Sequence, residues 1–191
     1  MSLIILDRDG VINEDSELFI KNEQEWIALP GSIAAIAELS KAGFDVYIAT
    51  NQSGLGRGLF SERDLEAMHG KLRRLVTEQG GQIAGIFYCP HAPDAGCDCR
   101  KPAPGLLWQI QTHAGRSVRG APMIGDSLRD LEAGVAAGCK PILVKTGKGE
   151  LTWQKIEREG IEDIEGIPFK EDLLVFNNLA QATQALVAGQ I

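Results

Sequence analysis

The stretch LIILDRDGVIN, residues 3–13, decides the fold. Its first four residues form an unbroken aliphatic run, which is typical of a parallel strand covered on both faces. The strand ends in a turn that carries two carboxylates, Asp7 and Asp9, and is closed by Gly10. Ligands of parallel sheets bind at the carboxyl ends of the strands, and half-buried carboxylates need a cation. The pair therefore predicts a metal or a phosphate-bound metal; a strand that simply ends in a solvated aspartate is the alternative.

Further apolar runs recur along the chain at residues 46–49, 83–88, 123–124 and 142–144, with a short one at 174–176. The intervening segments with helical periodicity are residues 32–42, 61–79, 105–113, 128–137 and 179–187. This alternation predicts an α/β fold, a three-layer αβα sandwich with a mainly parallel, doubly wound sheet. Ser61 and Asp64 have capping-box spacing at the start of one helix. Residues 150–172 are charged and weakly periodic, and we expect an irregular excursion there.

Length and charge limit the class of protein. The 191 residues, 44% of them hydrophobic, suit a single domain over residues 1–191 with one core. A net charge of -7 argues against nucleic-acid and acidic-membrane partners, so we expect a small-molecule substrate. We also expect a monomer. No apolar run approaches the ~20 residues of a membrane span, and no secretory signal pattern begins the chain. We therefore expect a cytoplasmic protein whose four cysteines form no disulfides.

The second apolar run leads into a turn rich in hydrogen-bond donors. Thr50, Asn51, Gln52 and Ser53 are followed there by Gly54. Hydroxyl and backbone N–H groups in such a turn can hold phosphate oxygens. The same residue types also make ordinary turns, so the turn alone is weak support for a phosphate site.

Two later strand ends carry charges of opposite sign. Arg100 and Lys101 precede Pro102 after the third run, where a cation can neutralise a transferring phosphoryl group. A solvated Arg-Lys pair is the alternative. The fourth run is followed by Asp126, which can also cap the next helix. Groups that phosphoryl transfer needs thus follow four successive predicted strands.

In this order DRDG at residues 7–10, Thr50, Lys101 and GDSLRD at residues 125–130 resemble the haloacid dehalogenase (HAD) superfamily of phosphohydrolases. The resemblance implies that Asp7 attacks phosphorus and becomes an aspartyl phosphate, while Asp9 acts as the acid and base. Thr50 and Lys101 complete the implied catalytic set. The implied cofactor is Mg²⁺, bound by Asp7, by the backbone carbonyl of Asp9 and by Asp126.

A second metal site is indicated by the spacing C-x-H-x5-C-x-C, formed by Cys89, His91, Cys97 and Cys99. These are soft ligands of the number and type that tetrahedral Zn²⁺ prefers. Four protein ligands leave no open position, so we expect structural zinc that orders a short loop and places the following cations at the active site. Three bystander thiols and a surface histidine are the alternative. We expect Cys139 to be a small core residue.

The zinc loop, CPHAPDAGCDCRKP at residues 89–102, narrows the resemblance to one subgroup. That subgroup contains D-glycero-D-manno-heptose-1,7-bisphosphate 7-phosphatases and histidinol-phosphate phosphatases. Three further stretches look more like the heptose enzymes: TNQSGLGRG at 50–58, GDSLRDLEAG at 125–134 and VKTGKG at 144–149. Histidinol phosphatases tend to have Asp where this chain has Ser53. The resemblance implies a sugar bisphosphate substrate on the route to nucleotide-activated heptose; a noncatalytic phospho-receiver is the alternative from another class.

The chain leaves no room for the cap domain that many HAD members carry, because only about twenty residues separate Gly10 from Pro30. We therefore expect an open mouth formed by short loops and the zinc loop. The distal phosphate of a bisphosphate would meet Arg57, Arg100 and Lys148 at its rim. His69 lies in a predicted helix, away from any cluster, and has no predicted role.

Overall fold

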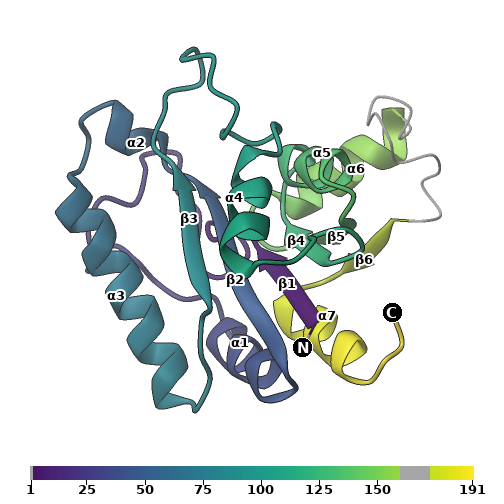
Figure 1. The fold of residues 1–191 in the computed structure, drawn as a ribbon. Coiled ribbons are helices and arrows are strands. Elements are labelled where there is room, and N and C mark those ends of the chain that lie inside the picture. The colour runs from purple at the N-terminus through teal and green to yellow at the C-terminus, as the bar shows by residue number, and fades with distance from the viewer. Residues whose placement is uncertain (1, 160–172) are drawn as a thin grey trace.

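The computed structural model describes residues 2–159 and 173–191. Its strands form one parallel sheet in the order β3-β2-β1-β4-β5-β6 (Figure 1). The strands are β1 (Ser2–Leu6), β2 (Phe44–Asn51), β3 (Gly85–Cys89), β4 (Pro122–Gly125), β5 (Lys140–Val144) and β6 (Leu174–Phe176). The helices are α1 (Ser32–Lys41), α2 (Ser53–Gly56), α3 (Glu62–Glu78), α4 (Gly105–Ala114), α5 (Leu128–Ala136), α6 (Gly149–Glu159) and α7 (Leu179–Val187).

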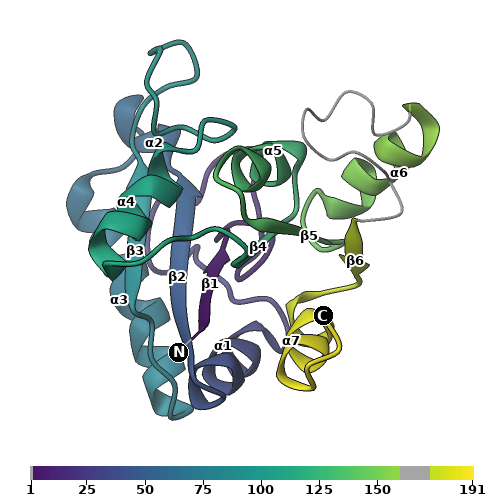
Figure 2. The same ribbon diagram turned by 45° about the vertical axis from the view of Figure 1, so that its right-hand side comes forward.

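Helices cover both faces of the sheet, as Figures 1 and 2 show. Ile4 and Leu6 point to one face, where they pack with residues of α1, α3 and α7. Leu3 and Ile5 point to the other face, where they pack with residues of α4 and α5. This double burial explains the unbroken aliphatic run of β1, because side chains of a strand alternate between faces. The predicted three-layer αβα sandwich is confirmed.

The order of the strands positions the functional site. The chain runs from β1 outward through β2 to β3, crosses back to β4 beside β1, and then continues to β6. The carboxyl ends of β1, β2 and β4 therefore adjoin at the point where the strand order reverses, which is where such sheets bind ligands. Residues 7–31, between β1 and α1, hold two isolated bridges and no helix, so no cap domain interrupts this edge.

One local prediction was wrong, and one short helix was missed. Residues 149–159 form helix α6 instead of an irregular segment, because Ile156 and the half-buried Trp153 pack on Leu131 and Leu143. The apolar face of this helix is narrow and its neighbouring residues are charged, so its helical periodicity is weak in the sequence. The rest of the predicted excursion, residues 160–172, lies outside the described residues. The short helix α2 was also not predicted, whereas the capping box of Ser61 and Asp64 at α3 is confirmed.

The single domain over residues 1–191 stays a prediction. Within the described ranges, none of the helices combines the length and the apolar character that crossing a membrane requires.

Candidate active site

A cavity of about 330 Å³ opens at the carboxyl edge of the sheet. Asp7 follows β1, Thr50 lies at the end of β2, and Asp126 follows β4. The loop after β3 reaches the same cavity with Arg100 and Lys101. The residues that the sequence placed on four strand ends therefore line one site.

Lys101 lies buried at the base of this cavity and uses all of its donors. Its Nζ lies 2.7 Å from Asp7 Oδ1 and 2.6 Å from Asp130 Oδ1, and it donates to the Ala49 carbonyl at 2.7 Å. Burial favours the uncharged amine, yet Asp130 and Asp7 outweigh it and raise the pKa of Lys101 to about 12. Lys101 is therefore a fixed cation against the proposed nucleophile.

The carboxylates around Lys101 are in excess over the positive charge. Ligand oxygens of Asp7, Asp126 and Asp130 all lie within 4.8 Å of one another, and the three residues are buried. Burial, with the charge of Asp130, raises the pKa of Asp7 well above its ordinary value and that of Asp126 to about 7. A buried, oxygen-only cluster with surplus negative charge fits a hard divalent cation such as Mg²⁺.

Asp9 is surrounded by hydrogen-bond donors. Arg8 donates to both of its carboxylate oxygens, Asn13 Nδ2 donates to Oδ1 at 2.8 Å, and Gln52 Nε2 donates to Oδ2 at 2.8 Å. Burial would raise the pKa of Asp9, but the charge of Arg8 and these hydrogen bonds lower it overall. Its side chain stays 23% exposed and lines the cavity. Asp9 thus stands within reach of a bound molecule as an ionised carboxylate.

Side chains of the turn after β2 line the cavity and also hold other residues of the site in place. Thr50 Oγ1 accepts a hydrogen bond from Gln52 Nε2 at 2.9 Å, which leaves the hydroxyl proton available to a ligand. The Asn51 amide makes two hydrogen bonds to the Lys101 backbone, at 3.0 and 3.1 Å, and so fixes the loop that carries the lysine. Ser53 lines the cavity at the first residue of α2. Substrate contacts by Asn51, Gln52 and Ser53 stay predictions.

Further cationic side chains line the cavity, together with the acidic residues Asp15 and Glu17. Arg57, Arg100 and Lys148 line it as predicted, and Arg129 joins them. Burial and then the charge of Arg129 lower the pKa of Arg100, a sign that the two guanidinium groups are close. Lys148 Nζ pairs with Asp15 at 2.5 Å, so it is less open to an anion than the arginines.

Asp126 does not cap α5, contrary to the expected second role. The N-cap residue is Ser127, which forms a capping box with Asp130. Asp130 Oδ2 accepts from the Ser127 backbone and hydroxyl at 3.0 and 2.6 Å, while its Oδ1 faces Lys101. Asp126 Oδ2 instead accepts from the Lys148 backbone at 2.8 Å and lies close to Gly10 and Gly147. The loops after β1 and β5 thereby close around Asp126.

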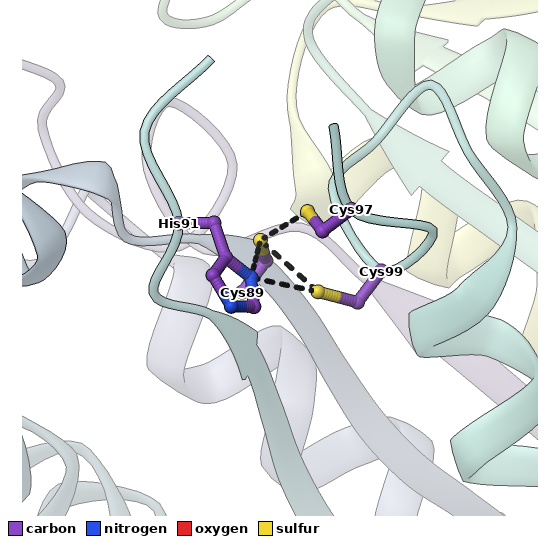
Figure 3. A group of neighbouring side chains, drawn as sticks. All are labelled: Cys89, His91, Cys97 and Cys99. Atoms are coloured by element: carbon purple, nitrogen blue, oxygen red, sulfur yellow. Dashed lines mark hydrogen bonds between the residues drawn. The ribbon is translucent and has the colours of Figure 1, made fainter. Parts of the chain in front are cut away.

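The four predicted zinc ligands lie close together, as Figure 3 shows. Cys89 Sγ lies 3.6 Å from Cys97 Sγ and 3.3 Å from Cys99 Sγ. His91 Nδ1 lies 3.5 and 3.3 Å from the sulfurs of Cys89 and Cys99. Zn–S bonds of about 2.3 Å and Zn–N bonds of about 2.0–2.1 Å in a tetrahedron give edges of about 3.6–3.8 Å. The chemistry and spacing of this donor set fit zinc.

Comparison with known proteins finds relatives that match almost the whole chain. A family model described as polynucleotide kinase 3 phosphatase matches residues 3–130, and a HAD-hydrolase-like model matches residues 98–182. The D-glycero-beta-D-manno-heptose-1,7-bisphosphate 7-phosphatase of Pseudomonas putida is 52% identical over 187 residues, 98% of this chain and 100% of that protein. The enzyme of the same name from Pseudomonas aeruginosa is 53% identical over 97% of this chain and 98% of its own length.

The chain belongs to the heptose-bisphosphate phosphatase family of HAD-like hydrolases. A crystal structure of D,D-heptose 1,7-bisphosphate phosphatase from B. bronchiseptica, complexed with magnesium and phosphate, is 46% identical, with a TM-score of 0.89. The match covers 99% of each chain. The resemblance predicted from the sequence motifs is therefore confirmed.

Several polar residues at or beside the cavity were not predicted from the sequence. Asp130 and Arg129 lie inside the GDSLRD run, whose acidic and basic residues were the available signal. Arg8 lies inside DRDG and is buried beside Asp9. His69, to which no role was given, contacts Arg8 from α3, and nothing in its local sequence indicates this.

Proposed function

We propose that the chain is a Mg²⁺-dependent phosphatase that removes the 7-phosphate of D-glycero-D-manno-heptose 1,7-bisphosphate through an aspartyl phosphate on Asp7. The reaction is a step on the route to nucleotide-activated heptose for lipopolysaccharide. The observation that carries the proposal is the buried Asp7 carboxylate, held by Lys101 and lying beside Asp126 and Asp9 in one cavity. The near full-length similarity to heptose-bisphosphate phosphatases supports the choice of substrate.

The proposed chemistry has two displacements at phosphorus. An Asp7 carboxylate oxygen attacks phosphorus, the bond from phosphorus to the sugar oxygen breaks, and Asp9 gives that oxygen a proton. Water then attacks the aspartyl phosphate, Asp9 takes the proton from water, and Asp7 leaves as a carboxylate. The approach of a phosphate dianion favours protonation of Asp9 before the first step, because a nearby like charge raises a carboxyl pKa.

Two residues act on the transferring phosphoryl group. The Thr50 hydroxyl donates to a phosphoryl oxygen, since its oxygen already accepts from Gln52. The Lys101 ammonium keeps Asp7 in place and stabilises negative charge in the transition state.

Magnesium would be held by the carboxylates of Asp7 and Asp126 and by the backbone carbonyl of Asp9. When bound, it supplies positive charge that offsets repulsion between the carboxylates and the phosphate. Asp130 fits this role less well, because both of its oxygens are engaged by Lys101 and Ser127. Zinc held by Cys89, His91, Cys97 and Cys99 would order the loop that presents Arg100 and Lys101.

The arginines at the mouth suit the distal phosphate of a bisphosphate. Arg57, Arg100 and Arg129 line the same cavity as Asp7, and a guanidinium can bind phosphate through two hydrogen bonds. A noncatalytic phospho-receiver is not favoured, because it has no use for an acid and base at Asp9.

The direct test is phosphate release by the purified protein with Mg²⁺. Heptose 1,7-bisphosphate of each anomer would be compared with histidinol phosphate and with a simple monophosphate. We expect the 7-phosphate of the bisphosphate to be released with the highest kcat/KM. A higher kcat/KM for histidinol phosphate would overturn the substrate assignment, and the absence of release from every ester would overturn the enzymatic one.

A further inference from the structure

A buried polar pair beside the cavity takes no part in the chemistry set out above. The Arg8 side chain is only 1% exposed. Its Nε and Nη2 donate to the Asp9 carboxylate over 2.9–3.1 Å, and its Nη1 lies 3.3 Å from Nε2 of His69. Removing a guanidinium from water is costly, so a buried arginine needs partners that offset this cost, and Asp9 and His69 are such partners.

His69 can only be the acceptor in this contact. It lies in α3, 61 residues away from Arg8 along the chain, and is 2% exposed. Burial, and then the charge of Arg8, lower the pKa of His69 to about 3, so the imidazole is neutral at neutral pH. Because a guanidinium has no acceptor, Nε2 accepts from Arg8 and the ring proton resides on Nδ1. The Tyr88 ring, with its centroid 6.0 Å away, packs beside the imidazole.

This pair determines how the Asp9 carboxylate is held. A guanidinium that contacts both oxygens fixes the plane of a carboxylate, which an ammonium or a single amide cannot do. Asn13 and Gln52 hold one oxygen each, but both amides belong to loops at the carboxyl edge. The contact from His69 ties the guanidinium to the long helix α3, which packs on the sheet and does not form the mouth.

We propose that Arg8 and His69 are positioning residues for the acid–base work of Asp9. The His69 acceptor sets the orientation of the Arg8 guanidinium, and the guanidinium sets the plane in which Asp9 meets the leaving oxygen. The inference rests on the proposed function, in which Asp9 protonates that oxygen. General acid catalysis contributes about 10²–10⁴ in rate and depends on alignment, so a misaligned Asp9 gives up part of that factor.

The test is the dependence of kcat/KM on the leaving group, because kcat/KM reports the steps up to departure of the first leaving group. His69→Leu removes the acceptor, His69→Gln retains one through its amide oxygen, and His113→Leu makes the same change at the exposed His113 of α4. We expect His69→Leu to lose about tenfold or more on heptose bisphosphate and less than about threefold on p-nitrophenyl phosphate, whose leaving group needs no acid. His69→Gln should recover most of the loss, and His113→Leu should show no selectivity.

Equal losses on the two esters for His69→Leu would overturn the proposal, since general damage to the fold slows both. Arg8→Lys keeps a buried cation but loses the two-oxygen contact, so it should show the same selectivity as His69→Leu. It supplies the decisive comparison even where His69→Leu does not fold. Absence of selectivity in a folded Arg8→Lys protein would also overturn the proposal.

A double variant separates this inference from the proposed function. When Asp9→Asn has removed the acid, adding His69→Leu should cause no further loss on heptose bisphosphate, because there is no acid left to position. Multiplied losses would overturn the positioning role. If Asp9→Asn alone slows both esters equally, the acid role of Asp9 in the proposed function fails. If Asp9→Asn is selective and neither His69→Leu nor Arg8→Lys is, only the positioning role fails.

Discussion

Replacing Lys101 by methionine removes the ammonium that three buried acceptors share. Nζ lies 2.7 Å from Asp7 Oδ1, 2.6 Å from Asp130 Oδ1 and 2.7 Å from the Ala49 carbonyl oxygen. Methionine has a similar length and volume, so Lys101→Met leaves little cavity behind. The change in stability is therefore mainly electrostatic.

A lower bound on the magnitude follows from the pKa of Lys101, which folding raises from 10.5 to about 12. A difference of this size favours the charged form in the folded protein by about 2 kcal/mol. That stabilisation is complete below pH 10.5 and is lost as the pH rises through about 12. The variant also leaves buried carboxylates without their partner, and breaking a buried pair costs about 3–5 kcal/mol. We expect the free energy of unfolding of Lys101→Met to be lower than that of the wild type by about 3–5 kcal/mol at pH 7.

The penalty should shrink in acid. Burial and Asp130 already raise the pKa of Asp7, and Lys101 opposes them. Removing Lys101 raises the pKa of Asp7 in the folded state further, so lowering the pH from 7 stabilises the folded variant more than it stabilises the folded wild type. The difference in unfolding free energy between wild type and Lys101→Met should therefore be smaller at about pH 5 than at pH 7.

The assay is urea denaturation followed by circular dichroism in metal-free buffer at both pH values. Lys21→Met is the matched control, because Lys21 forms an exposed pair with Glu25 at 3.8 Å and its loss should cost less than about 0.5 kcal/mol. Lys101→Met should also slow hydrolysis of every phosphate ester. A loss below about 1 kcal/mol at pH 7, with no decrease at pH 5, would refute the electrostatic reasoning.

Three further outcomes follow from the site. Asp7→Asn should fold and lose at least about 10⁴ in turnover, about 5 kcal/mol of barrier; normal phosphate release by the folded variant would exclude the covalent step. Mild dialysis against a chelator should abolish activity reversibly by removing Mg²⁺ while zinc stays bound; metal analysis that finds less than about half an equivalent of zinc in a folded, active preparation would contradict the zinc loop. Arg100→Ala should raise the KM of bisphosphates by a factor equivalent to about 1–3 kcal/mol of binding and spare monophosphates; equal losses on both esters in steady-state kinetics would count against its contact with the distal phosphate.

Local patterns in the chain were sufficient to predict the sheet and to place the candidate site residues at its edge. The aliphatic run of residues 3–6 identifies a strand buried on both faces, because burial on two sides removes the polar alternation of a half-exposed strand. Parallel strands bring their carboxyl ends to one edge, so Asp7 and Asp126 could be placed together before any contact was known. Predicting the four candidate zinc ligands needed no long-range information either, since Cys89 and Cys99 are 10 residues apart.

The partners of these residues depend on how distant segments pack. Asn51 holds the backbone of Lys101 across 50 residues, and His69 meets Arg8 across 61. Residue type shows that a side chain is polar, but not whether packing of a helix on the sheet removes it from water. Once water is excluded, each donor must find an acceptor within the protein, and the strength of each charge interaction rises. The raised pKa values of Asp7 and Asp126 and the neutral state of His69 result from that exclusion, which arises only when α3 and α5 pack on the sheet.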